Sequence, residues 1–145
     1  MTRPHPDPVR AVRRQLCREH TALIQGIEAC ADLVVEEWTD DRTATRQSQA
    51  VVDPLERALE SSGILEQLAV VLADAVDAAG CTLSAPPVPA PPYVVVTSRG
   101  PILRATIGPG RLVIRFETFE VVRDEFDRPV YQRLEEGVCL TVCLK

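Results

Sequence analysis

A proline-rich stretch near the middle of the chain limits its possible folds more than any other feature. Five prolines lie between residues 86 and 92, within the sequence CTLSAPPVPAPP. Proline fixes φ and lacks a backbone N–H, so this stretch is not helical and favours an extended, polyproline-like conformation. Apolar residues recur at helical spacing before it and alternate after it. We therefore expect a single domain, residues 1–145, in which a rigid crossover at 81–92 joins a helical part at 8–80 to a sheet at 93–145.

The helical part is expected to contain about three helices. Asp7–Pro8 combines a good N-cap with proline at the first helical position. One apolar stripe then continues to Trp38, which predicts a single long helix over 8–38. Gly26 marks either a weak point of this helix or a close packing contact. The polar residues 39–52 are expected to form a loop.

Two shorter helices are expected after this loop. Asp53–Pro54 repeats the combination of N-cap and proline, and this helix ends near Ser62–Gly63. The next helix covers about 64–79 and ends at Gly80, a typical position for a C-terminal helix glycine. Residues 1–7 are expected to be disordered.

The second half predicts an antiparallel meander of four to five strands. Its alternating segments are YVVVTSR, ILRATI, RLVIRFETFEVV, PVYQRL and VCLTVCLK. Turns are expected at Gly100–Pro101 and at Pro109–Gly110. The predicted cross-strand pairs include Val94–Ile107, Val96–Ala105, Ile107–Leu112, Leu103–Phe116, Arg104–Arg115, Gln132–Leu140 and Val130–Val142. With the helices packed on one face of this sheet, the fold class is α+β.

The third strand contains one conflict with simple alternation. Thr118 falls on the core face and Phe119 on the outer face, although their polarities are the reverse of what those faces need. A β-bulge near Glu117–Phe119 would correct this.

The last eight residues, VCLTVCLK, raise the question of a metal site. Cys139 and Cys143 lie four residues apart, and on a strand this separation is about 13 Å. One zinc ion with sulfurs at about 2.3 Å cannot bind both from a straight strand. We expect Val138, Leu140, Val142 and Leu144 to face the core and the two cysteines to face away. The sequence predicts no metal and no cofactor.

Charge and hydropathy exclude several classes of protein. The formal net charge of −5 makes binding to nucleic acid or to a membrane surface an unfavoured reading. The first residues, MTRPHPDPVR, contain no apolar signal segment, and no apolar run approaches the roughly 18–20 residues of a membrane span. We therefore expect a cytoplasmic protein with reduced thiols.

The stretch APPYVVVTSRGPILRATIGPGRLVIRF, residues 90–116, resembles a family of small uncharacterised proteins of halophilic archaea. The resemblance is to a domain of unknown function and involves no catalytic motif. It implies a cytoplasmic archaeal protein and supplies neither an activity nor site residues.

Enzyme chemistry has one weak candidate pair. Cys17 and His20 lie three apart on the first predicted helix, where they would share a face. A Cys–His pair needs a group that orients the base and an environment that lowers the thiol pKa, and no helix N-terminus points at either residue. No nucleophile elbow, zinc-protease motif or phosphate-binding glycine loop occurs. The sequence therefore leans towards a non-catalytic protein.

The face of the sheet away from the helices is the best candidate surface. Opposed Arg104 and Arg115 would repel each other unless they are neutralised. Glu117, diagonal to Arg104, is one neutralising group, and an anionic ligand or an acidic partner is the other. The candidate anion or partner surface comprises Thr97, Arg99, Arg104, Thr106 and Arg115. Val95, Ile102 and Val113 would be exposed beside it, a composition common at protein interfaces.

Three functions remain open at this point. The favoured hypothesis is a non-catalytic interaction module, which self-associates through the outer sheet face or the long helix, or binds another protein there. The alternative is a small-ligand or anion-binding regulatory domain that uses the arginines of this face. An enzyme built around Cys17 and His20 is the third.

Overall fold

The computed structural model describes residues 5–38, 44–135 and 137–145. In these ranges four helices are accompanied by seven antiparallel strands in two sheets, which confirms the α+β fold class and corrects the number of helices from three to four. The helices are α1 (Pro8–Glu19), α2 (Thr21–Glu37), α3 (Gln49–Ser61) and α4 (Ile64–Ala78). The strands are β1 (Ala44–Thr45), β2 (Val94–Thr97), β3 (Gly100–Ile107), β4 (Gly110–Glu117), β5 (Phe119–Arg123), β6 (Pro129–Arg133) and β7 (Cys139–Leu144).

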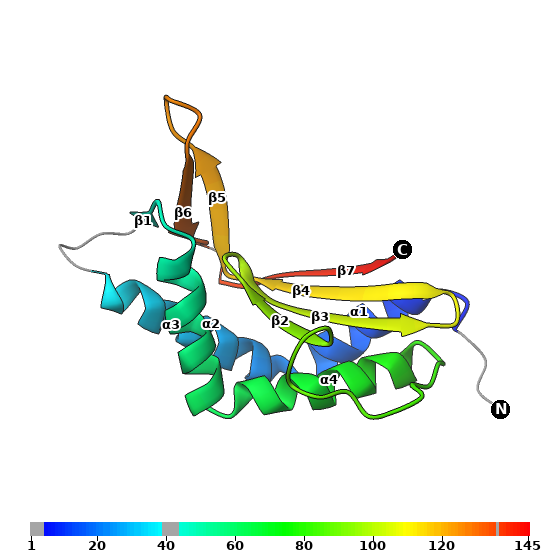
Figure 1. Ribbon diagram of the computed structural model, residues 1–145. Coiled ribbons are helices and arrows are strands. Elements are labelled where there is room, and N and C mark those ends of the chain that lie inside the picture. Colours follow the sequence, from blue (N-terminus) through cyan, green and yellow to red (C-terminus); the bar gives the residue numbers. More distant parts are fainter. Residues whose placement is uncertain (1–4, 39–43, 136) are drawn as a thin grey trace.

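The helices cover one face of a four-stranded sheet with the order β2-β3-β4-β7 (Figure 1). The other sheet has the order β1-β6-β5, and its β5–β6 hairpin projects away from the body on the side opposite the helices (Figure 1). The core lies between the helices and the inner face of the four-stranded sheet. Its largest fully buried side chains include Phe116, Phe119, Leu16, Ile27, Leu55, Leu59, Leu68, Leu72, Leu103, Leu112 and Ile114.

The long helix expected over 8–38 is interrupted at His20, which corrects that prediction. His20 leaves the helical conformation at φ −121° and ψ 28°, and its N–H closes α1 on the carbonyl of Leu16. Its ring reaches Asp74 of α4, with Nε2 3.3 Å from Oδ2. The break lets α1 pack against α4 and β7 while α2 packs against α3. The helix therefore breaks at a partly buried polar contact although the apolar stripe continues on both sides.

Gly26 is a close packing contact, one of the two predicted alternatives. A Cβ at this position would lie 2.7 Å from Cδ1 of Ile64, at the start of α4. Because real Cβ atoms do not approach that closely, a larger residue at this position would require the Ile64 side chain to shift.

The helix expected from Asp53 begins earlier, at Gln49, so that Pro54 lies inside α3. The loop expected at 39–52 therefore ends sooner, and residues 39–43 lie outside the described ranges. Proline deprives the carbonyl four residues before it, that of Ala50, of its helical donor. Trp38 Nε1 donates to this carbonyl at 3.0 Å. The side chain of the residue that follows α2 thus replaces the missing backbone hydrogen bond.

The other helix boundaries follow the sequence signals. Helix α4 covers 64–78 and is followed by Gly80 at φ +76°, as the glycine predicted. Before α1, Asp7 caps the helix through Arg10 N–H, and the N–H of His5 donates to the carbonyl of Ala79 at 2.8 Å. Residues 1–4, the rest of the segment expected to be disordered, lie outside the described ranges.

The observed strand registers differ from the predicted ones by even numbers of residues. Val94 lies opposite Leu103 rather than Ile107, and Ala105 lies opposite Leu112 rather than Ile114. The turns are Ser98–Arg99 and Gly108–Pro109, which lie two residues and one residue earlier, respectively, than predicted. An even shift keeps every side chain on its predicted face, so the burial pattern is the expected one.

Two glycines read as turn residues have a different role. Gly100 and Gly110 are the first residues of β3 and β4, at φ 141° and 156°. A Cβ on Gly100 would lie 2.0 Å from the carbonyl oxygen of Phe116, and one on Gly110 would lie 2.3 Å from that of Lys145. Glycine is required at both places by the close approach of a neighbouring strand.

After β4 the strands do not pair in the predicted order of a simple meander. Strand β7 pairs with β4, so that Leu140 lies opposite Phe116 and not opposite Gln132. Strands β5 and β6 pair with each other and leave the main sheet. The change of sheet occurs at Thr118, where the N–H groups of Thr118 and Phe119 both donate to the carbonyl of Arg99. This is the irregularity expected near 117–119, and it turns Phe119 into the core.

Arg133 connects the two sheets and α2 near Thr118, through hydrogen bonds and an ion pair. Its Nη1 donates to the carbonyls of Thr118, Leu134 and Gly137 at 2.8–3.2 Å. Its Nε lies 3.2 Å from Oδ1 of Asp32 on α2. One guanidinium therefore satisfies the carbonyls of the irregular chain that joins β4, β6 and β7.

Candidate functional site

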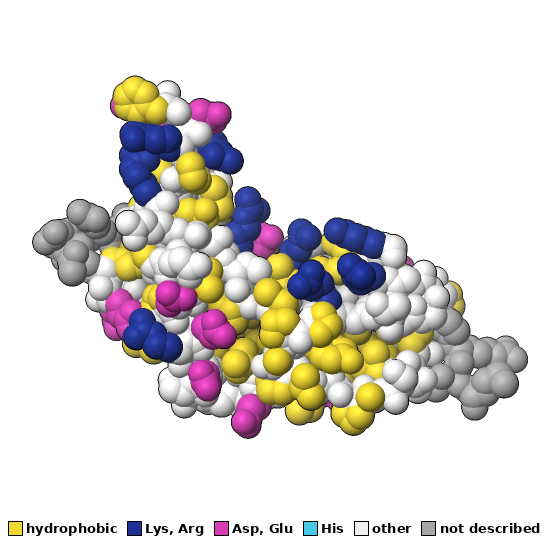
Figure 2. All heavy atoms as spheres, viewed as in Figure 1, with side chains coloured by type: hydrophobic (Ala, Val, Ile, Leu, Met, Phe, Trp, Pro, Cys, Tyr) yellow, Lys and Arg dark blue, Asp and Glu magenta, His cyan; other side chains and the backbone are white. Residues whose placement is uncertain are grey.

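The outer face of the four-stranded sheet, opposite the helices, contains the candidate site. We define the outer face by the side chains that alternate with the buried ones: Val95, Thr97, Ile102, Arg104, Thr106, Arg111, Val113, Arg115, Glu117, Cys139, Thr141 and Cys143. Figure 2 shows Lys and Arg side chains grouped over this sheet beside apolar ones. The alternation predicted for VCLTVCLK is confirmed, since Val142 is buried and Cys139 is exposed.

Arg104 and Arg115 lie diagonally and not face to face, which corrects the predicted pair. Arg104 is directly opposite Val113, and Arg115 lies between Ile102 and Thr141. The direct repulsion that the sequence predicted is therefore reduced by separation. Because each arginine has an uncharged neighbour in register, its stem can lie on apolar surface while the guanidinium reaches outwards.

Val113 is a buried residue on the outer face. It is only 5% exposed although the helices are on the other side of the sheet, and it is separate from the main core. Its cover must come from the same face, where its direct neighbours are Arg104 and Cys143. The outer face thus has a small apolar centre beneath charged side chains.

The Nε atoms of Arg104 and Arg115 are buried and have no hydrogen-bond partner within the described part of the chain. Leaving a buried donor unsatisfied costs about 1–3 kcal/mol. Glu117, the internal neutraliser that the sequence offered, forms no ion pair with either arginine among the described residues. The outer face therefore holds two guanidinium groups with unused hydrogen-bonding capacity.

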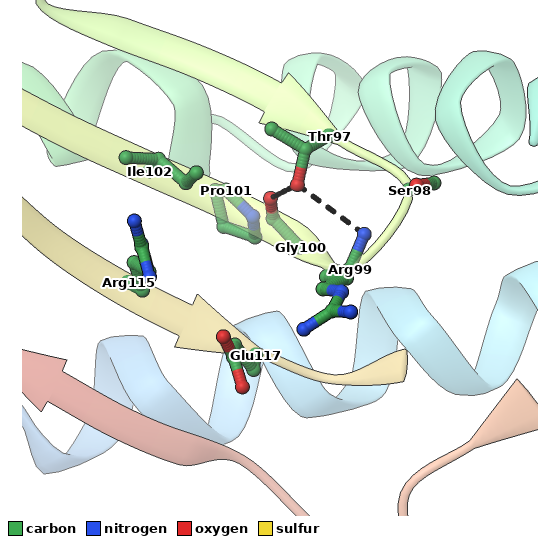
Figure 3. Close-up of a pocket in the computed structure, with 8 residues that line it drawn as sticks. All are labelled: Thr97, Ser98, Arg99, Gly100, Pro101, Ile102, Arg115 and Glu117. Carbon is green, nitrogen blue, oxygen red and sulfur yellow. Dashed lines mark hydrogen bonds between the residues drawn. The ribbon is translucent and has the colours of Figure 1, made fainter. Parts of the chain in front are cut away.

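A first recess of about 330 Å³ opens at the turn between β2 and β3 (Figure 3). It is lined by Thr97, Ser98, Arg99, Gly100, Pro101, Ile102, Arg115 and Glu117. The hydroxyl of Thr97 donates to the carbonyl of Gly100 at 2.7 Å and accepts from the N–H of Arg99 at 3.2 Å. Thr97 consequently stabilises the turn, and its hydroxyl is already engaged. Arg99 and Arg115 are the cations of this recess, and Glu117 is its anion.

A second recess of about 350 Å³ lies beside the proline-rich crossover. It is lined by Leu83, Ser84, Ala85, Pro92, Tyr93, Arg104, Ala105, Thr106 and Arg111. It exists because β2 covers only Gly100–Leu103 of its neighbour, and beyond it the N–H of Arg104 donates to the carbonyl of Tyr93. This recess contains two arginines and no carboxylate.

The structure thus divides the five predicted residues between two recesses. Thr97, Arg99 and Arg115 line the first, and Arg104 and Thr106 line the second. Sequence reasoning missed Arg111, which lies directly opposite Thr106. Strand alternation was a sufficient signal, because Arg111 has the same parity as Val113 and Arg115.

Cys17 and His20 do not form a catalytic pair in the described hydrogen bonds. His20 Nε2 lies 3.1 Å from Nε2 of Gln15 and 3.3 Å from Oδ2 of Asp74, so the ring connects α1 to α4. Cys17 is exposed on α1. In residues 5–38, 44–135 and 137–145, no group of three or more His, Cys, Asp or Glu side chains is placed to hold a metal ion.

Cys30 is the thiol whose ionisation the fold alters most clearly. Burial raises the pKa of this thiol, and a contact with the Ser62 hydroxyl at 3.7 Å partly offsets the effect. A buried thiol with a raised pKa stays protonated at neutral pH and is a poor nucleophile. Cys30 therefore acts as a small apolar residue between α2 and the end of α3.

None of the described helices is both long and apolar enough to cross a membrane.

Comparison with known proteins identifies a family but no activity. Neither the curated proteins nor the solved structures contain a match to this chain. A family model for a domain of unknown function, DUF7988, matches residues 10–145, which include all four helices almost completely and every strand. The chain therefore belongs to the DUF7988 family.

Proposed function

We propose that this chain is a non-catalytic binding module whose outer face receives an acidic surface of another protein. The observation that carries the proposal is the pair of buried, unpartnered Nε atoms on Arg104 and Arg115. Carboxylates bind guanidinium groups by charge-assisted, often bidentate hydrogen bonds. Burial keeps a docking carboxylate from the two Nε atoms, so such a partner would bind the Nη groups of the same arginines, which form no ion pair with a described residue.

Charge complementarity favours an acidic partner. The outer face and its margins carry Arg99, Arg104, Arg111, Arg115 and Lys145. None of these five cations forms an ion pair with a described residue. The whole chain, by contrast, has a formal net charge of −5. A local cationic face on an acidic chain steers acidic surfaces towards one side of the molecule.

The apolar component supports a protein rather than a free ion. Val95 and Ile102 are opposite each other on the outer face, and both are half-buried. An interface that combines a few arginines with apolar residues is typical of protein–protein contacts. The projecting β5–β6 hairpin stands on the same side as the outer face (Figure 1). It gives a partner a second surface to contact beside the sheet.

Two alternatives for this face are weaker. Two copies joined face to face would oppose the same arginines, which disfavours self-association through this surface. A single-stranded nucleic acid would need several stacking aromatics, and among the residues that line the two recesses Tyr93 is the one aromatic side chain. An acidic protein partner requires neither like-charge contact nor stacking.

A titration with poly-L-glutamate tests the proposal. We expect it to bind the wild-type chain with an affinity that falls as salt rises, and to bind the double variant Arg104→Met, Arg115→Met at least about tenfold more weakly, since two charged contacts are lost. The matched control is Arg14→Met, Arg18→Met, because both residues are exposed on α1 and the charge change is equal. Equal weakening by the control, or tighter binding of oligothymidylate than of poly-L-glutamate, would overturn the proposal.

A second candidate function rests on the recess beside the crossover. Arg104, Arg111 and Thr106 converge there without a carboxylate, which is a suitable environment for a small organic acid or phosphate. Thermal-shift titrations with phosphate and with citrate test this regulatory-domain hypothesis. Stabilisation that disappears in Arg111→Gln and persists in Arg99→Gln would support it. Loss in both variants, or no stabilisation at all, would rule it out.

A further inference from the structure

Strand β7 forms an edge of the four-stranded sheet, and its two sides have different hydrogen-bond partners. Arg111 and Lys145 exchange two backbone hydrogen bonds of 2.9 Å, which fixes the phase of the β4–β7 ladder. In an antiparallel pair, alternate residues turn their N–H and C=O groups towards the neighbouring strand and away from it. Cys139, Thr141 and Cys143 therefore pair with β4, while the backbone groups of Leu140 and Val142 point outwards. Leu144 has the same phase and also points outwards.

One of these outward groups is already occupied. The carbonyl of Leu140 accepts from Nη1 of Arg13 on α1 at 3.1 Å. The backbone groups of Val142 and Leu144 have no such partner among the hydrogen bonds of the described residues. Arg13 thus occupies an outward carbonyl near the start of β7, whereas the outward N–H and C=O groups at Val142 and Leu144 are free to pair with another strand.

Natural edge strands are usually protected by charge, by proline or by shortness, because open backbone groups pair with other chains. The six residues CLTVCL of β7 contain neither a charge nor a proline. By contrast, β5, an edge of the other sheet, carries Glu120 and Arg123. The opposite edge strand, β2, has four residues and packs against α3. β7 is therefore the longest edge strand of the described sheets that contains neither a charge nor a proline. Helix α1 packs against it, but the outward backbone groups of Val142 and Leu144 keep no partner among the described residues.

We propose that a second copy of the chain pairs antiparallel with this edge, with Val142 opposite Leu144 of the second copy. This register uses only the free residues on both copies and leaves the contact between Arg13 and Leu140 intact. The register with Val142 opposite itself would pair Leu144 with Leu140 of the second copy and displace Arg13. The two-fold pairing joins two four-stranded sheets into one eight-stranded sheet.

The same register extends the core across the joint. Val142 and Leu144 belong to the inner, helix-facing side of the sheet, where Val142 is buried and Leu144 is half-buried. Val142 of each copy would lie against Leu144 of the other copy, so Leu144 would lose its remaining exposure. The pairing therefore adds apolar contact to the backbone hydrogen bonds.

Cys143 provides a direct readout of this register. When Val142 faces Leu144, Cys143 faces its own counterpart on the two-fold axis. It would form a non-hydrogen-bonded pair with a Cα separation of about 4.5 Å, which lies within the range that a disulfide spans. Its side chain is on the outer face and half-exposed. Cys139 would lie about 26 Å from its counterpart, since eight residues of strand separate them at about 3.3 Å each.

Oxidation with diamide tests the register. The variant Cys17→Ser, Cys139→Ser keeps Cys143 as the accessible described thiol, because Cys30 and Cys81 are buried. We expect it to form a disulfide-linked dimer under native conditions and not in denaturant. The matched control, Cys17→Ser, Cys143→Ser, keeps Cys139 and is expected to remain uncrosslinked. Equal crosslinking of the control, or no crosslinking through Cys143, would overturn the proposed register.

Light scattering tests the pairing itself without any thiol chemistry. The wild-type chain is expected at twice the monomer mass of 15.9 kDa. Leu144→Pro removes an outward N–H and leaves the β4–β7 ladder its donors, so we expect a folded monomer. Leu144→Ala also removes most of the leucine side chain but keeps the backbone N–H, and we expect this variant to remain dimeric. A monomeric wild-type chain, or a Leu144→Pro variant that stays dimeric, would contradict the proposal.

Discussion

The two faces of the four-stranded sheet are built from the same strands and have opposite character. On the inner face, Leu103, Ile114 and Phe116 are completely buried against the helices. On the outer face, Arg104 and Arg115 bury their Nε atoms without a partner in the described chain. The inner face is a finished interface between a sheet and its helices. The outer face has the apolar centre and the charges of an interface, but no described element packs against it as the helices do against the inner face.

This difference indicates which residues determine the fold and which are available for function. Truncation on the inner face removes contacts that the whole chain depends on. Truncation on the outer face should leave stability nearly unchanged and alter binding. The following predictions test that contrast, beginning with the largest expected effect.

The neighbouring residues Leu103 and Ile102 compare the two faces at one place in β3. Leu103→Ala should lower the free energy of unfolding by about 2–5 kcal/mol, because it removes a completely buried side chain. Ile102→Ala, on the outer face, should cost about 1 kcal/mol or less, as half-buried surface positions do. Urea denaturation measures both. Equal losses would mean that the outer face is as essential to folding as the inner one.

Arg133 is an arginine whose hydrogen bonds are satisfied inside the molecule. Arg133→Met should lower the free energy of unfolding by about 2–3 kcal/mol, because it leaves the carbonyls of Leu134 and Gly137 without their donor and removes one of two donors from the carbonyl of Thr118. Denaturation by urea provides the measurement, and Arg99→Met at an exposed turn is the control. A variant as stable as the wild type would show that water replaces the guanidinium at no cost.

Arg115 is the contrasting arginine on the outer face. Arg115→Met should leave stability unchanged or raise it by up to about 1 kcal/mol, since the buried Nε atom without a partner disappears while the apolar stem is retained. Thermal unfolding of the variant and the wild type gives the comparison. A clear loss of stability would reveal an internal partner for Arg115 and weaken the case for an external one.

The smallest expected effect is local and concerns the β5–β6 hairpin. The backbone N–H of Arg128, the Arg46 side chain and the N–H of Phe126 hold the pKa of Asp124 well below its usual value of 3.8. A lowered pKa in the folded state means that this carboxylate stabilises the hairpin above pH 3.8 and loses that contribution as the pH falls further.

Amide hydrogen exchange measures this effect. Exchange at Phe126 and Arg128 should accelerate as the pH drops below 3.8, relative to amides of β3. Asp124→Asn should show faster exchange of the same amides already at neutral pH. Exchange that is unaffected by this substitution would mean that the hairpin does not depend on the Asp124 contacts.

The sequence predicted the large-scale plan because its signals are local. The prolines at 86–92 separate two periodicities, and strand alternation assigns each side chain to a face whatever the register. For that reason Arg104 and Arg115 were correctly placed on one face although their pairing was wrong by two residues. An even shift leaves the apolar pattern unchanged, so the pattern cannot select among such registers.

Other features depend on contacts between distant residues. His20 interrupts the first helix where its ring meets Asp74, far along the chain, with Nε2 3.3 Å from Oδ2. Gly100 and Gly110 were read as turn residues, although the approach of a neighbouring strand is what requires them. The pairing of β7 with β4 skips two strands, and no local signal marks it. The division of the candidate site into two recesses follows from the short β2, which is equally a tertiary feature.

The most direct test of the account is an NMR titration of the wild-type chain with poly-L-glutamate. The account predicts that the largest amide shifts fall on β3 and β4, at Arg104, Val113 and Arg115, and that they vanish in the Arg104→Met, Arg115→Met variant. Shifts concentrated on α1, α2 or α3, or no shifts at low salt, would contradict the claim that the outer face is the binding surface.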